Sequence, residues 1–475
     1  MNAESLQGFF NDAFLTGVSP MLTLTVGVLL LLLIEIFPQG DKLRPIVFVA
    51  TLLSAFWGEV LISRDPIGPI LGGTYAADSA SAYWGMIFLA STLIAWIFGR
   101  RYYKTDRKFL GEHDVLMLCT PIGMMLMAGA EDLIVFFVGL ELLSIPLYCL
   151  ASFQRARDRS VEAGLKYFVL GAFAAALFLY GAALTYMDSG TLSMIELREL
   201  GIHSTLGLTG VGLMLASLFF KVSVFPFHLW VPDVYQGSPT PVTTLMATGT
   251  KAAGFAFLLK LIFLLPSGAA PVIAAIAVIT MAVGNLGALV QEDVKRMLAY
   301  SGIAHAGTLL LVVAGALAGD PEGQSTGAAL YYMAAYVFTA GGAFGLLSWL
   351  EADGEHFTKL ESLRGLAGRR PGIAAALTLF MLSLGGIPAT GGFLGKWFVF
   401  SVAVRSGLTG FAIVGALLSV VALGYYLRVI VAMYMQPEIE GQAPPMTRRM
   451  SASLATGLCV AMVLALGLLP GFFIG

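Results

Sequence analysis

The chain has 475 residues, of which 58% are hydrophobic and only 12% are charged. So few charges cannot cover the surface of a soluble protein of this length, and a formal net charge of −2 excludes the basic field that nucleic-acid binding needs. Many apolar runs are close to 20 residues, the length that crosses a bilayer as a helix. The composition therefore predicts an all-α, polytopic membrane protein.

Fourteen apolar runs are the predicted membrane helices of a single integral membrane domain over residues 1–475. They lie at about 20–37, 43–62, 80–98, 114–130, 131–150, 162–186, 206–224, 241–264, 268–290, 297–317, 327–349, 372–404, 409–434 and 450–472. The run 372–404 is too long for one straight crossing and contains Pro388 between two Gly pairs, which predicts an interrupted helix. The seventh run ends at Pro226, which predicts a second break. Broken helices in corresponding parts of two halves are typical of transporters.

The distribution of Lys and Arg predicts the orientation. Loops on one side carry most of these residues, including Lys295 and Arg296, and the longest loop, at about 350–371, belongs to that charged side. The loops on the other side carry only three basic residues. Because basic loops stay in the cytoplasm, both termini are expected on the periplasmic side of a bacterial inner membrane.

Four ionisable residues fall near the middle of predicted spans, where a charge costs a few kcal/mol or more. They are Glu141, Lys221, Lys251 and Lys396. In a purely structural interpretation, each lysine extends to the membrane surface and Glu141 is a protonated, hydrogen-bonded carboxyl. In a functional interpretation they exchange protons, since burial disfavours the charged form of a group and a nearby opposite charge favours it. A buried Glu–Lys pair that forms and breaks would then switch the proton affinity of the lysine.

Three further residues are weaker candidates for the same proton path. Lys166 lies only about four residues into its predicted helix, so reaching the membrane surface is nearly as favoured as a function. His305 lies about nine residues into an apolar run, and His228 lies beside the break at Pro226. Each histidine is either a proton relay or a hydrogen-bonded core residue.

Motifs for other chemistries are missing from the sequence. The three cysteines, Cys119, Cys149 and Cys459, are isolated in apolar runs and form no CxxC pair, so no iron–sulfur, haem or zinc ligand set is expected. GGFLGKW is similar to the end of a phosphate-binding loop, but Thr390 stands where that loop needs its first Gly. No cofactor and no metal are predicted in this chain.

Four blocks of the sequence resemble the antiporter-like membrane subunits of respiratory NADH:quinone oxidoreductase (complex I). FKVSVFPFHLWVPDVYQGSPTPVTTLMATGTKAAGF is similar to the most characteristic segment of that family, and VGLELLSIPLYCLASFQRARDRSVEAGLKYFVLGA, VQEDVKRMLAYSGIAHAG and GIPATGGFLGKWFVF are similar to three further blocks in the family's order. The resemblance covers about residues 80–434. Lys396 stands where the related subunit M carries Glu, and the chain stops after the fourteenth span, where subunit L continues into a lateral helix. The family has three related subunits, and both features favour the one that is neither subunit M nor subunit L.

The resemblance implies a fold and roles for the candidate residues. It implies fourteen helices in which three helices (about 20–98) precede two inverted five-helix repeats (about 114–264 and 268–434) and one final helix (about 450–472). It implies that Glu141 and Lys221 form a Glu–Lys pair, that Lys251 is the central relay and that Lys396 is the terminal lysine. His305 and Lys166 match positions along the same polar axis with weaker support, and no motif is assigned before about residue 75.

The resemblance also implies that the chain is a subunit of a proton-translocating NADH:quinone oxidoreductase, without a redox centre of its own. NADH, FMN, iron–sulfur clusters and quinone are expected in partner subunits, so the driving force must arrive as a conformational or electrostatic change. The expected partners are the other membrane and peripheral subunits, including subunit M and the small membrane subunits, and the lipid bilayer. A subunit of a monovalent cation/proton antiporter, which shares these blocks, and a non-transporting membrane scaffold are the alternatives.

Overall fold

The structure is a computed structural model that describes residues 12–37, 40–103, 110–320, 323–351, 358–438 and 450–471. The longer helices of the first half are α2 (Asp12–Ile34), α3 (Gly40–Arg64), α4 (Ser79–Tyr102), α5 (Leu110–Gly129), α6 (Leu133–Ala151), α7 (Asp158–Ser189) and α9 (Thr205–Val222). They are followed by one span, Thr240–Leu264, that contains α11 (Thr240–Leu245), a π-helical turn (Met246–Thr250) and α12 (Lys251–Leu261). The longer helices of the second half are α13 (Ala270–Leu289), α14 (Val294–Leu317), α15 (Ser325–Glu351), α17 (Pro371–Gly385), α18 (Gly391–Arg405), α19 (Thr409–Met435) and α20 (Met450–Leu468).

Short elements connect these helices. Three are helical, namely α8 (Met194–Leu200), α10 (Trp230–Gly237) and α16 (Leu366–Arg369). The strands β1 (Gly68–Ile70) and β2 (Tyr75–Ala77) form an antiparallel hairpin between α3 and α4, in a register that pairs Gly68 with Ala77 and Ile70 with Tyr75. Within the described residues this hairpin is the only sheet.

All fourteen predicted spans correspond to helical segments in the described part of the chain. Twelve of them are helices long and apolar enough to cross a membrane. The thirteenth is α5, a 20-residue helix whose beginning carries Glu112 and Asp114. The last is the pair α17 and α18, of 15 residues each. The prediction of an all-α, polytopic membrane protein is confirmed.

Both predicted helix breaks are present. α9 ends at Val222, Ser223 has a left-handed backbone (φ 70°), and the chain passes through Pro226 before α10 begins. α17 ends at Gly385, and the N–H of Gly386 (φ 85°) donates to the carbonyls of the preceding turn. Glycine suits position 386 because it adopts this left-handed conformation without strain and because a Cβ there would lie 3.0 Å from Lys396 Cδ.

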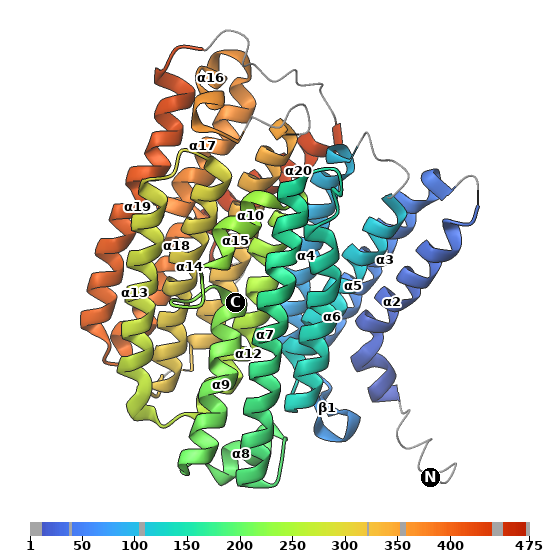
Figure 1. Cartoon of the computed structure of the whole chain (residues 1–475), viewed down its shortest axis with the longest axis vertical. Coiled ribbons are helices and arrows are strands. Elements are labelled where there is room, and N and C mark those ends of the chain that lie inside the picture. Colours follow the sequence, from blue (N-terminus) through green and yellow to red (C-terminus); the bar gives the residue numbers. More distant parts are fainter. Residues whose placement is uncertain are drawn as a thin grey trace.

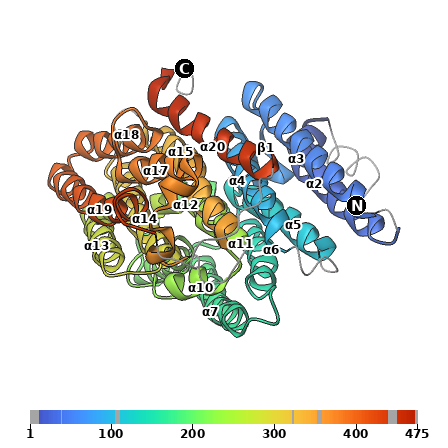
Figure 2. The same cartoon turned by 90° about the horizontal axis from the view of Figure 1, so that it is seen from above.

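The most buried spans lie in the interior of the bundle. α2 and α3 stand at one edge of the molecule, and α13 and α19 stand at the opposite edge (Figures 1 and 2). Residues 240–264, α14 and α15 are buried along almost their whole length, whereas α19 and α20 expose most of theirs. The exposed faces are apolar, as with Leu417 and Leu454, which suits contact with lipid or with other membrane subunits. Two of the candidate residues, Lys251 and His305, lie in these interior spans.

Two predicted loop positions are wrong. Lys295 lies in the first turn of α14, which begins at Val294 because the Asp293 carboxylate caps it by accepting the N–H of Arg296. Glu351 is the last residue of α15, although a loop was expected from about residue 350. A capping residue extends a helix beyond its apolar run, and hydropathy does not register this.

Candidate functional site

Lys221 and Glu141 lie on neighbouring helices without forming an ion pair. Lys221, in the last turn of α9, donates from Nζ to Ser144 Oγ at 2.7 Å and lies 3.4 Å from the Tyr167 hydroxyl. Ser144 follows Glu141 by one turn of α6, so both side chains share one helix face. The carboxyl oxygen Oε1 of Glu141 is buried and has no hydrogen-bond partner in the described residues. A serine hydroxyl therefore holds the ammonium beside a carboxyl that is free to approach it.

Lys251 is the most completely buried of the candidate lysines, with 1% of its surface exposed. It follows a π-helical turn (Met246–Thr250), and its Nζ donates to the carbonyl of Gly302 on α14 at 2.5 Å. Nζ also lies 5.6 Å from the centre of the Tyr336 ring, within the range of a cation–π interaction. On the other side, a Cβ built on Gly254, one turn after Lys251, would lie 3.9 Å from Lys221 Cγ. Lys251 therefore contacts α14, and its own helix passes close to Lys221 at Gly254.

His305 stands one turn after Gly302 and joins two tyrosines. Its Nδ1 is 2.5 Å from the Tyr332 hydroxyl, and its Nε2 is 3.2 Å from the Tyr426 hydroxyl. A tyrosine hydroxyl both donates and accepts, so this pair of contacts serves either neutral tautomer of the imidazole. A cavity of about 10 Å³, enough for about one water molecule, adjoins the ring. It is lined by His305, Tyr332, Tyr336, Thr339, Ser383, Leu384 and Gly392.

Lys396 is held by the break in the second half. It lies in α18, and its Nζ donates to the carbonyls of Leu384 at 2.9 Å and Gly385 at 3.1 Å. These carbonyls end α17, where the negative end of the helix dipole favours a cation. Leu384 also lines the cavity beside His305. Each candidate residue thus has its own local contacts: Lys221 bonds to the helix face of Glu141, Lys251 bonds to α14 one turn before His305, and Lys396 bonds to Leu384, which lines the cavity beside His305. Glu141, Lys221, Lys251, His305 and Lys396 are called the row below, and all of them except Glu141 are buried.

Two predicted site residues lie outside this row. Lys166 has a side chain that is 42% exposed and pairs with Glu162 at 2.7 Å and with Asp233 at 3.1 Å. His228 is buried between the first break and α10, where its Nδ1 has no partner in the described residues and its ring centre is 5.7 Å from that of Phe225. The structure does not connect either residue to Lys251.

Asp233 belongs to an ion-pair network at the surface of the bundle. Its carboxylate accepts from Lys166 and, at 2.7 Å, from Arg296. Partial burial alone would raise the pKa of this carboxyl, but the hydrogen bonds and positive charges of Arg296 and Lys166 outweigh it and hold the pKa below its usual value. Lys166 therefore has a structural partner that its position in the sequence did not reveal.

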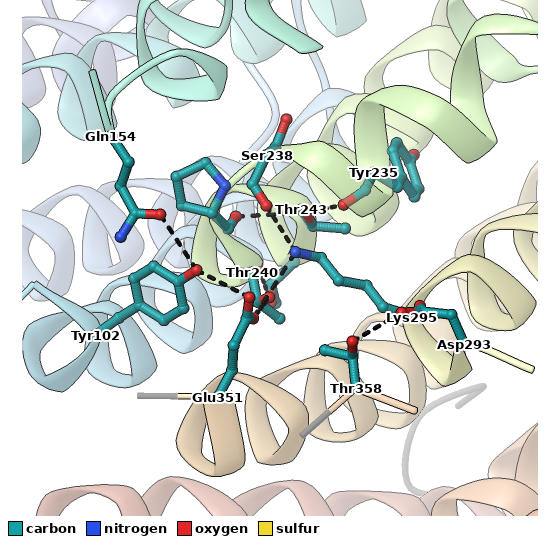
Figure 3. A network of polar contacts seen from close by, with 12 residues as sticks. Tyr102, Gln154, Tyr235, Ser238, Thr240, Thr243, Asp293, Lys295, Glu351 and Thr358 are labelled. Carbon is teal, nitrogen blue, oxygen red and sulfur yellow. Dashed lines mark hydrogen bonds and ion pairs between the residues drawn. The ribbon is translucent and has the colours of Figure 1, made fainter. Parts of the chain in front are cut away.

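Sequence reasoning missed a second buried cluster, around Glu351 (Figure 3). The carboxylate of Glu351 accepts from the Tyr102 hydroxyl at 3.1 Å and from the Thr240 hydroxyl, and it lies 3.8 Å from Lys295 Nζ. Lys295 is 1% exposed and donates to the Ser238 carbonyl at 2.6 Å. The signal that could have found it is Asp293, a capping residue that places Lys295 inside a helix.

A family model described as NADH:quinone oxidoreductase/Mrp antiporter, TM, matches residues 130–422. NADH-quinone oxidoreductase subunit N of Myxococcus xanthus (strain DK1622) is 40% identical, over 96% of this chain and 95% of that protein. This chain belongs to the subunit N family of NADH-quinone oxidoreductases. Subunit N of Salinibacter ruber (strain DSM 13855 / M31) is 41% identical over 94% of this chain and 91% of that protein. The resemblance found in the four sequence blocks is confirmed.

Solved structures agree with this assignment. A chain of respiratory complex I from Thermus thermophilus with bound aureothin is 36% identical and has a TM-score of 0.82, covering 96% of this chain and 98% of that one. A chain of the Mrp complex from Dietzia sp. DQ12-45-1b has a TM-score of 0.83 at 21% identity, covering 97% of this chain and 96% of that one. The second likeness shows a shared fold alone. The chain is therefore an antiporter-like membrane subunit of the complex I type, which works in a multisubunit enzyme.

Proposed function

We propose that this subunit moves protons across the membrane through the row of Glu141, Lys221, Lys251, His305 and Lys396. The observation that carries the proposal is the state of the lysines at 221, 251 and 396. Each is buried and, in the described part of the chain, is held by a hydroxyl or by backbone carbonyls rather than by a carboxylate within 4.0 Å. An ammonium buried without a counter-ion has no purely structural benefit that a neutral side chain would lack.

Proton movement along this row needs both charge and water. Burial without a counter-ion brings the charged and neutral forms of a group closer in free energy, which reversible proton binding requires. The phenol hydroxyls at Tyr332 and Tyr426 link His305 to its surroundings, and the cavity beside His305 is also lined by Leu384, whose carbonyl accepts from Lys396. Motion of the Glu141 carboxylate toward or away from Lys221 would alter the field at Lys251, because charges interact strongly at low dielectric.

The proposal also includes the partner subunits, the repeats of the fold and the membrane in which the subunit lies. Electron transfer takes place in partner subunits, where NADH, FMN, iron–sulfur clusters and quinone are bound, and the neighbours in the membrane include subunit M and the small membrane subunits. The chain is one membrane domain in which two inverted five-helix repeats each contribute one of the two breaks. It lies in a bacterial inner membrane, with both termini on the periplasmic side. The chain ends themselves lie outside the described residues.

Replacing Lys396 by alanine tests the function. We expect Lys396→Ala to assemble into the complete complex and to lower NADH-driven proton transport at least about tenfold, because the second half loses its only proton-binding group at the break. Proton uptake or release by proteoliposomes during NADH oxidation measures this, with complex assembly checked by native gel electrophoresis. Near-normal transport in assembled complexes would refute the proton path.

Replacing Lys166 by methionine is the matched comparison, because methionine keeps most of the length of the side chain. We expect Lys166→Met to leave proton transport within about twofold of the wild-type rate, since a half-exposed ion pair contributes only about 0–1 kcal/mol. The same proteoliposome assay measures it. A loss as large as that of Lys396→Ala would place Lys166 on the proton path despite its exposure.

A further inference from the structure

We propose that the buried cluster around Glu351 and Lys295 takes up protons for Lys251 from the cytoplasmic side, along a row of threonine hydroxyls on α11 and on the π-helical turn that follows it. This inference rests on the proposed function. It names the path by which protons enter, which the proposed function does not specify. It assigns a role to two charged residues, one of each sign, that lie outside the row of buried lysines. It also assigns a role to buried threonines that packing alone does not require.

The cluster is arranged around one carboxylate that receives several donors (Figure 3). Tyr102 of α4 and Thr240 of α11 donate hydrogen bonds to Glu351. Arg157, from the connection between α6 and α7, lies 3.7 Å from Glu351 Oε1, and Lys295 of α14 lies 3.8 Å from Oε2. The carboxylate therefore faces two cations and two hydroxyls that come from four separate segments of the bundle.

An open hollow lies near this cluster. It has a volume of about 410 Å³, and it is lined by residues that include Arg159, Gln236, Asp293 and Arg296. Asp293 and Arg296 flank Lys295 in the chain, and Gln236 precedes by two residues the serine whose carbonyl binds Lys295. Arg159, Arg296 and Lys359 all line this hollow, and the distribution of basic residues assigns their side to the cytoplasm. The cluster therefore lies next to an open hollow on the side from which protons must be taken up.

A row of hydroxyls runs from the cluster toward Lys251. Thr240, Thr244 and Thr248 are fully buried and lie four residues apart, so their side chains follow one helix face at intervals of about 6 Å. Thr244 donates to the Thr240 carbonyl, and Thr248 donates to the Thr244 carbonyl and lies 2.6 Å from Ser91 Oγ. Thr248 precedes Lys251 by three residues, or about one turn. Every turn of this span between Glu351 and Lys251 therefore presents a hydroxyl.

Threonine hydroxyls that bond to their own helix are also a packing feature, so the row by itself would be ordinary. Three buried hydroxyls along the same route, however, have no partner in the described residues. They belong to Ser238, whose carbonyl binds Lys295, to Ser348, one turn before Glu351 on α15, and to Thr250, the residue before Lys251. Leaving such a group without a hydrogen bond costs about 1–3 kcal/mol, and bound water would remove that cost. Unpartnered hydroxyls at both ends of the row point to water sites that would bridge the gaps between the threonines.

The proposed transfer conserves charge. The Glu351 carboxylate takes one proton from water in the hollow and becomes a neutral carboxylic acid. Lys295 and Arg157 then lose their counter-charge, and their repulsion favours onward release of the proton. The proton passes along water molecules held by the threonine hydroxyls to the neutral amine of Lys251, which becomes an ammonium while the carboxylate of Glu351 is restored.

Two substitutions in the complete complex test this path. We expect Glu351→Gln and Thr248→Val, each close in shape to the native residue, to slow NADH-driven proton transport in proteoliposomes at least about threefold, since general acid–base groups contribute larger factors. The matched control is Thr243→Val on the same helix. The Thr243 hydroxyl is equally buried but donates to the Tyr235 carbonyl, away from the row (Figure 3). The control is expected to transport protons at the wild-type rate.

The dependence on pH separates an uptake path from a structural role. The titratable and charged groups that face Glu351 are Tyr102 and Tyr103 of α4, Arg157 and Lys295. If protons enter here, lowering the pH on the cytoplasmic side by one unit will restore part of the rate lost in Thr248→Val, because proton supply is limiting. The same change on the opposite side will restore nothing.

The possible outcomes distinguish failure of the entry path from failure of the proposed function. Wild-type rates in both variants, or losses that are equal at every pH on both sides, would overturn the entry path. If Glu351→Gln does not assemble, Thr248→Val decides alone, since it removes one hydroxyl and no charge. Normal transport in a Lys251→Met complex would overturn the proposed function itself, whereas slow transport there with normal rates in both path variants would overturn only the entry path.

Discussion

Replacing Lys251 by methionine will reduce NADH-driven proton transport by at least about a hundredfold in assembled complexes. The size of the effect follows from position, because Lys251 contacts α14 one turn before His305 while its own helix passes close to Lys221. Without a group that binds a proton there, the row is interrupted, and loss of a positioned acid–base group typically costs about 10²–10⁴ in rate. Methionine fills a similar volume, so packing around Tyr336 is preserved. The measurement is the initial rate of proton transport per complex in proteoliposomes.

Lys251→Arg is the informative control for this prediction. Arginine keeps the positive charge and the hydrogen-bond donors but cannot be deprotonated in a protein. If the row works by proton exchange, the arginine variant will be as inactive as the methionine variant. Normal transport with arginine would mean that a fixed charge is sufficient, and normal transport with methionine would remove Lys251 from the path.

Gly392→Ala is expected to destabilise the second half by about 2–3 kcal/mol, the upper range for overpacking a tightly packed site. A Cβ at residue 392 would lie 1.9 Å from the Ser383 carbonyl oxygen, so α18 cannot begin where it does. The N–H of Gly392 also donates to Ser383 Oγ at 3.2 Å, a contact that ties the two helices of the break together. Moving α18 would withdraw Lys396 from the carbonyls that hold it. The expected result is a lowered midpoint of thermal unfolding together with reduced proton transport.

Gly410→Ala is the control substitution, at the start of α19. No atom lies within 4 Å of a Cβ built there, and alanine favours a helix more than glycine does. This variant should unfold at the wild-type temperature or slightly above it. An unchanged midpoint in Gly392→Ala would show that the segments on either side of the break separate without cost, in which case this break does not fix the position of Lys396.

The sequence predicted the spans, both breaks and the intramembrane lysines because each of these signals is local. A run of apolar residues has a length, and a proline or glycine pair interrupts a helix wherever the helix packs. The partners of the lysines are not local. The carbonyl that receives Lys251 belongs to Gly302, and the hydroxyl that receives Lys221 belongs to Ser144 on another helix. The spacing of residues along the sequence does not predict such contacts between helices.

The charged residues near helix ends were harder to interpret. Lys295 was counted among the loop charges, yet the Asp293 cap draws it into a helix where Glu351 and Ser238 surround it. Lys166 was a candidate for the polar axis, yet its side chain is half-exposed because α10 places Asp233 at the surface beside it. Hydropathy measures how apolar a stretch is, whereas exposure near a helix end depends on which neighbouring element covers it.

The acceptors at Lys251 and Lys396 are uncharged peptide oxygens. Such an oxygen accepts a hydrogen bond from an ammonium and, more weakly, from a neutral amine, so each lysine can keep the same anchor before and after its proton leaves. The nitrogen therefore needs no new rotamer during turnover, and little reorganisation energy is spent. An uncharged anchor also leaves the positive charge unneutralised, so whichever lysine is loaded repels a second proton from its neighbour. If only one lysine is protonated at a time, neighbouring lysines of the subunit bind the proton alternately.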